Sequence, residues 1–190
     1  GLSLVDLNAG VLAALGMVSA IHRAKETGTG CDVDVSLFDT ALSLLGYVGA
    51  WHLTKGYEPV RMPDSSHPSQ IPSQVLPTKD GWLVVMCAKE KFYQNFVRIL
   101  GAPELADDER FRTSADRMVN RETLVPLLKD LTRKQTTDVW LGKLKGEVPC
   151  APVHTVEQAF QDPQANEDEM VIEMDHPEFG KVRVPAGSIK

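Results

Sequence analysis

Residues 4–42 carry the pattern that most restricts the fold of this chain. Apolar residues recur at three- and four-residue steps as far as Ile21, so one face of a helix should be buried. Gly28 and Gly30 are expected to end that helix, because glycine accepts the left-handed conformation of a C-cap. From Cys31 to Leu37 apolar and polar residues alternate, which predicts a short strand with one buried face. The order of helix, strand and helix is typical of an α/β fold.

A second helix is expected to begin at Ser36, because Ser36 and Asp39 have the spacing of a capping box. The same spacing at Thr113 and Asp116 and at Thr155 and Gln158 predicts two further helix starts. Asp6 lies just before the first apolar helix. An acid at that place is most often an N-cap or a partner of the helix dipole, so the position of Asp6 alone does not indicate a catalytic role.

The remaining chain predicts a linker and a second domain. Four prolines between residues 55 and 74 predict extended, irregular chain. Asp80 and Gly81 lie between two apolar runs, which predicts a β-hairpin. We expect a helix at 89–100, a helix from Thr113 to about Arg133 kinked at Pro126, and a second pair of strands near the end. The predicted organisation is a fragment of a doubly wound nucleotide-type domain at 1–54, a linker at 55–74 and a small α+β domain with an antiparallel sheet at 75–190.

Several blocks of sequence resemble the class III CoA-transferases, the family of carnitine CoA-transferase and formyl-CoA transferase. They are VDVSLFD at 33–39, HPSQIPSQVLPTKDGWLVV at 67–85, LGAPELADDERFRT at 100–113, VPCAPVHTVEQAFQDPQ at 148–164 and MVIEMDHPEFGKVRVP at 170–185. They occur in the family's order and spacing, and together they cover nearly the whole chain.

The resemblance implies a reaction and a set of residues. Asp6 stands at the position of the family's nucleophile, and Leu37 stands where the family has an apolar residue against CoA. His67 lies in a loop that approaches the active site in the family, as do Ser69, Gln70 and Gln74. No glycine-rich lid is present in that loop. The family uses coenzyme A esters as substrates, holds no permanent cofactor and forms interlocked homodimers.

Family members are about twice as long as this chain, and their upstream nucleotide-binding half has no counterpart here. We therefore interpret the sequence as a fragment that is inactive by itself. Among the members, those that act on dicarboxylate CoA esters such as succinyl-CoA resemble it most.

Two other functions fit the sequence. An α-methylacyl-CoA racemase has a similar fold and would use the acid at Asp6 for proton transfer. Racemases carry a Gly-Gly-Ala-Pro-type sequence before the hairpin, whereas HPSQIPSQVLPTKDG is transferase-like. The third reading is a non-catalytic interaction domain, which an acyl-CoA assay would separate from the other two.

The composition excludes some classes of partner. A formal net charge of −6 argues against a general nucleic-acid or anionic-membrane binder. Three scattered cysteines predict small buried hydrophobes rather than a disulfide framework. The histidines lack metal-ligand spacing. Trp82 and Trp140 are interpreted as core aromatic residues. The apolar run from Ala9 to Ile21 is interpreted as too short for a membrane span and unlike a signal peptide. The expected location is the cytoplasm, or the mitochondrial matrix in a eukaryote.

Overall fold

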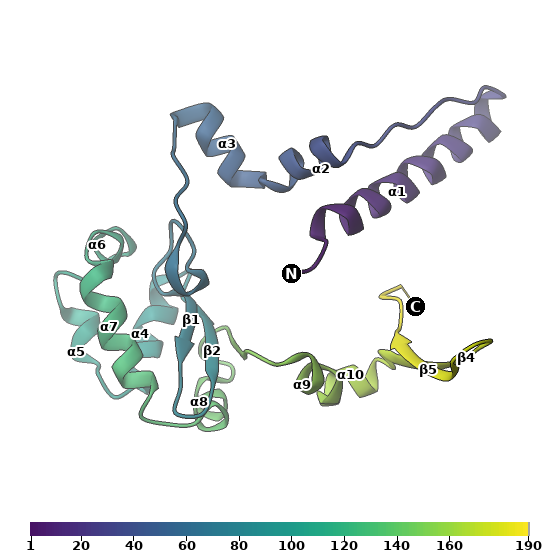
Figure 1. Cartoon of the computed structure of the whole chain (residues 1–190). Coiled ribbons are helices and arrows are strands. Elements are labelled where there is room, and N and C mark those ends of the chain that lie inside the picture. The colour runs from purple at the N-terminus through teal and green to yellow at the C-terminus, as the bar shows by residue number, and fades with distance from the viewer. Residues whose placement is uncertain (190) are drawn as a thin grey trace. The chain divides into compact units, whose positions relative to one another are not determined.

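The computed structural model describes residues 1–189 and divides the chain into two units, residues 1–61 (unit 1) and 62–190 (unit 2). Unit 1 is helical, and unit 2 combines helices with two antiparallel sheets (Figure 1). The predicted mixed α/β class is confirmed. The boundary at residue 61 falls inside the segment that the sequence predicts as a linker.

Three helices make up unit 1: α1 (Leu4–Thr27), α2 (Leu37–Leu44) and α3 (Gly46–Lys55). Gly28 ends α1 with φ of 73° and donates its N–H to the carbonyl of Ala24 at 2.8 Å, as a left-handed C-cap does. The Ser36 hydroxyl accepts the N–H of Asp39 at 3.0 Å and so caps α2. Both predicted helix boundaries are confirmed.

The strand predicted between Cys31 and Leu37 does not form, and residues 29–36 have no regular secondary structure and no sheet partner among the described residues. A strand needs a neighbour to accept its backbone hydrogen bonds, and a period of two in the sequence does not supply one. Val33 of this segment packs on α1 at Gly16. A Cβ built on Gly16 would lie 2.7 Å from a Val33 methyl, so only glycine allows this approach.

Helix α1 is 24 residues long, and only 6% of its most apolar stretch is buried. By length and composition it could cross a membrane, so the reading that this run is too short is wrong. A helix that packs in the core of a protein would also be long, apolar and exposed in this structure if its packing partners were not part of this chain. Val11 is 67% exposed and Val18 is 66% exposed, whereas Ala9 is the buried residue of the helix.

Unit 2 begins with the short 3₁₀ helix η1 (Pro63–Ser65), and its first sheet has the order β1–β2–β3. The strands are β1 (Ser73–Pro77), β2 (Trp82–Met86), β3 (Cys150–Pro152), β4 (Val171–His176) and β5 (Gly180–Pro185). The helices are α4 (Glu90–Ile99), α5 (Glu104–Asp107), α6 (Ser114–Val119), α7 (Arg121–Thr132), α8 (Thr137–Leu144), α9 (Val156–Gln161) and α10 (Pro163–Glu167). The predicted hairpin is β1–β2, and the predicted second pair is β4–β5, a separate antiparallel sheet.

The hydrophobic core of unit 2 lies between the first sheet and the helices α4, α7 and α8 (Figure 1). Leu83 and Val85 alternate along β2 on the buried face, and Phe96 of α4 and Leu128 of α7 are fully buried against them. Trp140 was expected in the core and is 3% exposed. Trp82 was expected there too, but it is 48% exposed because it points to the other face of β2 from Leu83.

The helix predicted from Thr113 to Arg133 is two helices, α6 and α7, and the break falls at Asn120 rather than Pro126. The Asn120 side chain donates to the carbonyls of Arg110 at 3.0 Å and Asp116 at 2.9 Å, which holds its backbone outside helical geometry. Pro126 remains inside α7. The predicted capping box of Thr113 and Asp116 is present at the start of α6.

Arg117 joins the parts of unit 2 that are distant in sequence. Its side chain is 1% exposed and donates to the carbonyl of Ile71 at 2.7 Å, to the carbonyl of Phe111 at 3.0 Å and to the Glu90 carboxylate at 2.8 Å. Its guanidinium carbon also lies 4.1 Å from the centre of the Tyr93 ring. One buried side chain thus binds the loop before β1, helix α4 and the chain before α6.

Replacing Arg117 should therefore destabilise unit 2 strongly. We expect Arg117→Met to lower the free energy of unfolding by about 3 kcal/mol, because two buried carbonyl oxygens lose their donor. Urea unfolding measures the loss. Arg133→Met is the control, since Arg133 is exposed and, among residues 1–189, forms its ion pair with Asp130 of the preceding turn, so its replacement should cost less than about 1 kcal/mol. Equal losses in the two variants would contradict the role assigned to Arg117.

Asp80, in the β1–β2 turn, caps helix α8. Its carboxylate accepts the N–H of Thr137 at 2.8 Å and the Thr137 hydroxyl at 3.0 Å. The bond from the Thr137 backbone is the main reason that the pKa of Asp80 lies below its ordinary value of 3.8. The stabilisation by the Asp80 carboxylate is therefore complete above that ordinary value, and it is lost as the pH falls through the lowered pKa of the folded state.

We expect Asp80→Asn to unfold at a lower temperature than the wild type at neutral pH. The difference should shrink as the pH falls below about 3.8 and disappear once Asp80 is protonated in both states. Thermal unfolding followed by circular dichroism at stepped pH measures it. The exposed Asp107 is the control, and Asp107→Asn should melt close to the wild type at neutral pH. If the difference in melting temperature between Asp80→Asn and the wild type grew as the pH fell, the stabilising role assigned to the Asp80 carboxylate would be contradicted.

Candidate active site

Asp6 lies in the first turn of α1, as its third residue. Its side chain is exposed and has no hydrogen bond or ion pair with any residue of 1–189. The N-cap of α1 is Ser3, whose side chain makes no capping hydrogen bond, so Asp6 is not an N-cap. The N-terminal end of a helix has free N–H groups and a positive partial charge, both of which favour an anion there. The carboxylate is thus accessible and not engaged in holding the helix.

Leu37 and His67, the other two candidates, lie in different units. Leu37 is the first residue of α2 in unit 1 and is 53% exposed. His67 is partly buried in unit 2, where its Nδ1 accepts the N–H of Ser69 at 3.1 Å and its own N–H donates to the carbonyl of Ser73 at 2.8 Å. Because Nδ1 accepts, the neutral ring carries its hydrogen on Nε2. The structure groups Asp6 with Leu37 in unit 1 and holds His67 within a braced loop of unit 2.

No group of three or more metal-binding side chains occurs within residues 1–189. The three thiols have different surroundings: Cys31 is exposed, Cys150 is partly buried and Cys87 is buried. The expectation of buried cysteines is therefore wrong for Cys31, because the segment that carries it has no sheet partner. Burial raises the pKa of Cys87 to about 12, so that thiol is protonated at neutral pH and is a poor nucleophile.

A hollow that was not predicted from the sequence lies in unit 2 between the segment before β1 and helix α7. Arg121 and Lys129 of α7 line it, together with Ser66 and Gln74. Arg121, Val125 and Lys129 recur every four residues along α7 and so share one face of the helix. The four-residue spacing could have indicated that Arg121 and Lys129 share one face of a helix. Nothing in the sequence indicated that the proline-rich segment would lie opposite that face.

The model of the family described as "CoA-transferase family III" matches residues 1–190. The chain belongs to CoA-transferase family III. The resemblance found in the sequence blocks is thereby confirmed, and it covers both units.

Named relatives within CoA-transferase family III match the chain from end to end. Human succinyl-CoA:glutarate CoA-transferase is 29% identical over 191 residues, which are all of this chain and 43% of that protein. Acetyl-CoA:oxalate CoA-transferase of Acetobacter aceti is 34% identical over 192 residues, which are all of this chain and 48% of that protein. This family III chain thus spans less than half the length of these relatives.

Solved structures of similar proteins show the same fold. The crystal structure of a CAIB/BAIF family protein from Brucella suis has a TM-score of 0.74 and 30% identity, covering 96% of this chain and 51% of that one. A crystal structure of Rv3272 from M. tuberculosis has a TM-score of 0.84 at 22% identity and covers 98% of this chain and 49% of that one. This family III chain matches about half of each structure.

The thiol surroundings in this family III chain predict a clear order of reactivity. In the folded chain at pH 8 we expect Cys31 to react quickly with a thiol reagent and Cys87 to react only after denaturation, because burial hides Cys87 and keeps it protonated. Mass spectrometry of iodoacetamide-treated peptides measures the order. Cys31→Ser is the control and should remove the fast modification. Fast labelling of Cys87 in that variant would contradict its burial.

Proposed function

We propose that the longer protein containing this chain moves CoA from an acyl-CoA to a carboxylic acid, with Asp6 as the nucleophile. The observation that carries the proposal is the match of the whole chain to CoA-transferase family III. The unpaired, exposed carboxylate of Asp6 supports it, because a nucleophile must be free to reach its substrate.

The proposed reaction proceeds through two covalent intermediates on Asp6. The Asp6 carboxylate attacks the thioester carbonyl of the donor, the C–S bond breaks, and a mixed anhydride and CoA thiolate form. The thiolate then attacks the aspartyl carbonyl, which releases the donor acid and leaves Asp6 as a CoA thioester. The acceptor carboxylate attacks this thioester and repeats the two steps in reverse, which regenerates Asp6. Covalent catalysis divides one difficult exchange into easier steps.

Short dicarboxylic acids are the substrates we propose. The names of similar proteins pair succinyl-CoA with glutarate or mesaconate, and acetyl-CoA with oxalate. These names also favour a transferase over the racemase reading, as does the sequence HPSQIPSQVLPTKDG before and within the hairpin. CoA esters enter as substrates in this proposal, and no bound cofactor is required for the steps on Asp6.

The apolar surface of unit 1 supports a larger assembly, which we propose to be an interlocked homodimer of the full-length protein. Leu53 is 87% exposed, Phe38 is 71% exposed and Leu15 is 62% exposed. Side chains of this kind are normally covered in a soluble protein. The rest of the longer protein and a second copy of it would together cover these side chains, and the rest of the longer protein would supply the pocket for CoA.

Removing the Asp6 carboxylate should abolish the covalent intermediate. In the full-length protein we expect Asp6→Ala to lose the CoA adduct and to lower turnover about a thousandfold or more, because the nucleophile is gone. The measurement is mass spectrometry of the intact protein after incubation with succinyl-CoA, with turnover followed in parallel. The 190-residue chain alone should transfer no CoA, because much of the positioning of the substrates is absent from it.

Asp39→Ala is the matched control for the Asp6 variant. Asp39 is likewise the third residue of its helix, α2, so its loss removes an acid from the same helical position without touching Asp6. The Asp39 variant should retain the adduct, and Asp6→Asn should retain the fold without the adduct. An adduct that persists in Asp6→Ala would rule Asp6 out as the nucleophile.

A further inference from the structure

Unit 2 begins with a tight turn, residues 62–66, which we call the 62–66 turn. The N–H of Ser66 donates to the carbonyl of Pro63 at 2.9 Å. The two residues between them, Asp64 and Ser65, have positive φ of 53° and 51°. A type I′ turn has this pattern, because both of its central residues take the left-handed conformation.

The sequence of the 62–66 turn does not favour this conformation. Glycine, asparagine and aspartate dominate the central positions of type I′ turns, so Asp64 fits its position and Ser65 does not. In the left-handed conformation the Cβ of Ser65 crowds the following carbonyl oxygen. Such residues persist only where the surrounding structure determines their conformation. The 62–66 turn therefore needs contacts from elsewhere in unit 2.

Lys129 of α7 makes the first of these contacts. Its Nζ lies 2.6 Å from Oδ2 of Asp64, and the two side chains are 25% and 21% exposed. Because water reaches both groups only in part, their attraction is screened less than that of a fully exposed ion pair. Lys129 thus ties the centre of the 62–66 turn to the helix.

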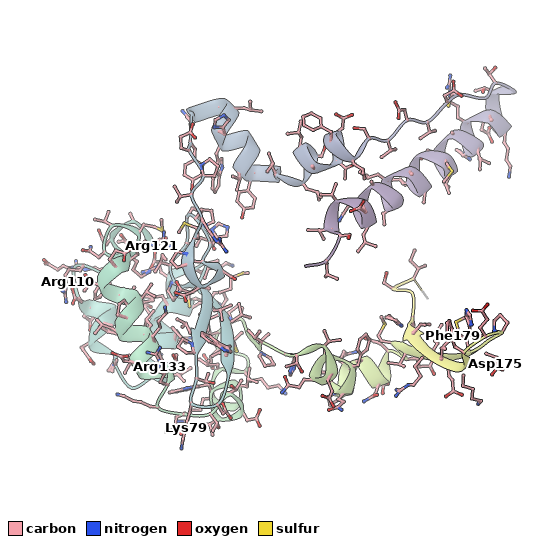
Figure 2. All side chains as sticks on the ribbon, viewed as in Figure 1. Lys79, Arg110, Arg121, Arg133, Asp175 and Phe179 are labelled. Atoms are coloured by element: carbon pink, nitrogen blue, oxygen red, sulfur yellow. The ribbon has the colours of Figure 1, made fainter. Side chains whose placement is uncertain are left out.

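Arg121 contacts both ends of the same turn. Its guanidinium donates to Ser66 Oγ at 2.8 Å and lies 3.9 Å from Met62 Sδ. Arg121 is the first residue of α7, and Arg133 lies at the opposite end of that helix (Figure 2). Two cations of one helix therefore hold the 62–66 turn at its start, its centre and its end.

The chain just before the 62–66 turn is exposed. Tyr57 is the last residue before it that is held firmly, since His52 Nδ1 lies 3.0 Å from its carbonyl oxygen and its ring packs edge-on against Trp51. Val60 is 68% exposed, and Arg61 is exposed too. If the 62–66 turn opened, residues 62–65 would join this exposed connection and lengthen it by about 13 Å of extended chain.

We infer that the 62–66 turn is a two-state clamp. The ion pair of Asp64 and Lys129 holds it closed against the strain at Ser65, and loss of the pair releases residues 62–65 into the connection between the units. Because the closed state depends on an ion pair, salt shifts the balance toward the open state. The inference involves neither CoA nor Asp6, so it does not rest on the proposed function.

The test is hydrogen exchange of the Ser66 amide in the 190-residue chain, measured by NMR, because this N–H loses its acceptor when the turn opens. We expect Lys129→Gln to speed the exchange about fivefold. Sodium chloride at high concentration should speed it in the wild type but not in Lys129→Gln. Lys134→Gln removes an exposed lysine and should leave the exchange unchanged. The amide of Leu83, in the central strand β2, should keep its wild-type rate in every variant, which separates opening of the turn from unfolding of unit 2.

Ser65→Gly tests whether the ion pair acts against strain. Glycine takes a positive φ without steric cost, so Ser65→Gly alone should slow the exchange about threefold or more. In the Lys129→Gln background it should restore the wild-type rate. Ser65→Ala keeps the Cβ and is the matched control, which should neither slow the exchange nor restore it.

Three results would overturn the inference. A wild-type rate in Lys129→Gln would mean that the ion pair does not hold the turn. Failure of Ser65→Gly to slow the exchange, or equal rescue by Ser65→Ala, would mean that the pair opposes no strain at Ser65. Equal acceleration by Lys134→Gln would mean a general effect of lost charge. If Lys129→Gln does not fold, Asp64→Asn takes its place and must also speed the exchange, since asparagine tolerates the left-handed conformation.

Discussion

Arg117 is the interaction on which the organisation of unit 2 depends. Burying a guanidinium costs free energy because the charged group loses its water. A buried arginine is therefore tolerated only where acceptors surround its N–H groups on several sides. Here those acceptors are the carbonyls of Ile71 and Phe111 and the carboxylate of Glu90. The loop before β1 is fixed by the same contact as the start of α4. Since His67 and the hollow lined by Arg121 and Lys129 lie on that loop or beside it, their geometry depends on Arg117.

The parts of the fold that were predictable are those that a few neighbouring residues determine. The Asp80-Gly81 turn predicted the β1–β2 hairpin, and the capping spacings at Ser36, Thr113 and Thr155 marked where α2, α6 and α9 begin. Each of these depends on hydrogen bonds between residues a few positions apart. For Asp6 the sequence predicted a position just before the first helix, whereas α1 begins two residues earlier, at Leu4. The resemblance to a family supplied the candidate role of Asp6.

The predictions that failed needed partners distant in sequence or absent from this chain. The alternation from Cys31 to Leu37 has the period of a strand, but a strand forms only beside another strand. Trp82 is apolar enough for a core, yet the register of β2 turns it outward. Pro126 looked like the break in a long helix, but Asn120 made the break through bonds of its own side chain. For the candidate site, no local pattern in the sequence indicated that Ser66 and Gln74 would meet Arg121.

Strand β3 has a consequence for how unit 2 can be shortened. It has three residues, and it pairs with β2 only after the chain has passed through α4 to α8. By pairing with Leu83 to Val85, β3 covers the backbone edge of β2 opposite β1. A chain cut after α8 would keep most of the apolar core but present that edge bare, and a bare edge next to buried apolar residues is a template for pairing with another copy. A shortened unit 2 that does not pair with other copies must therefore extend at least to residue 152, the end of β3. This limit comes from the need to cover the edge of β2 and not from the extent of the hydrophobic core.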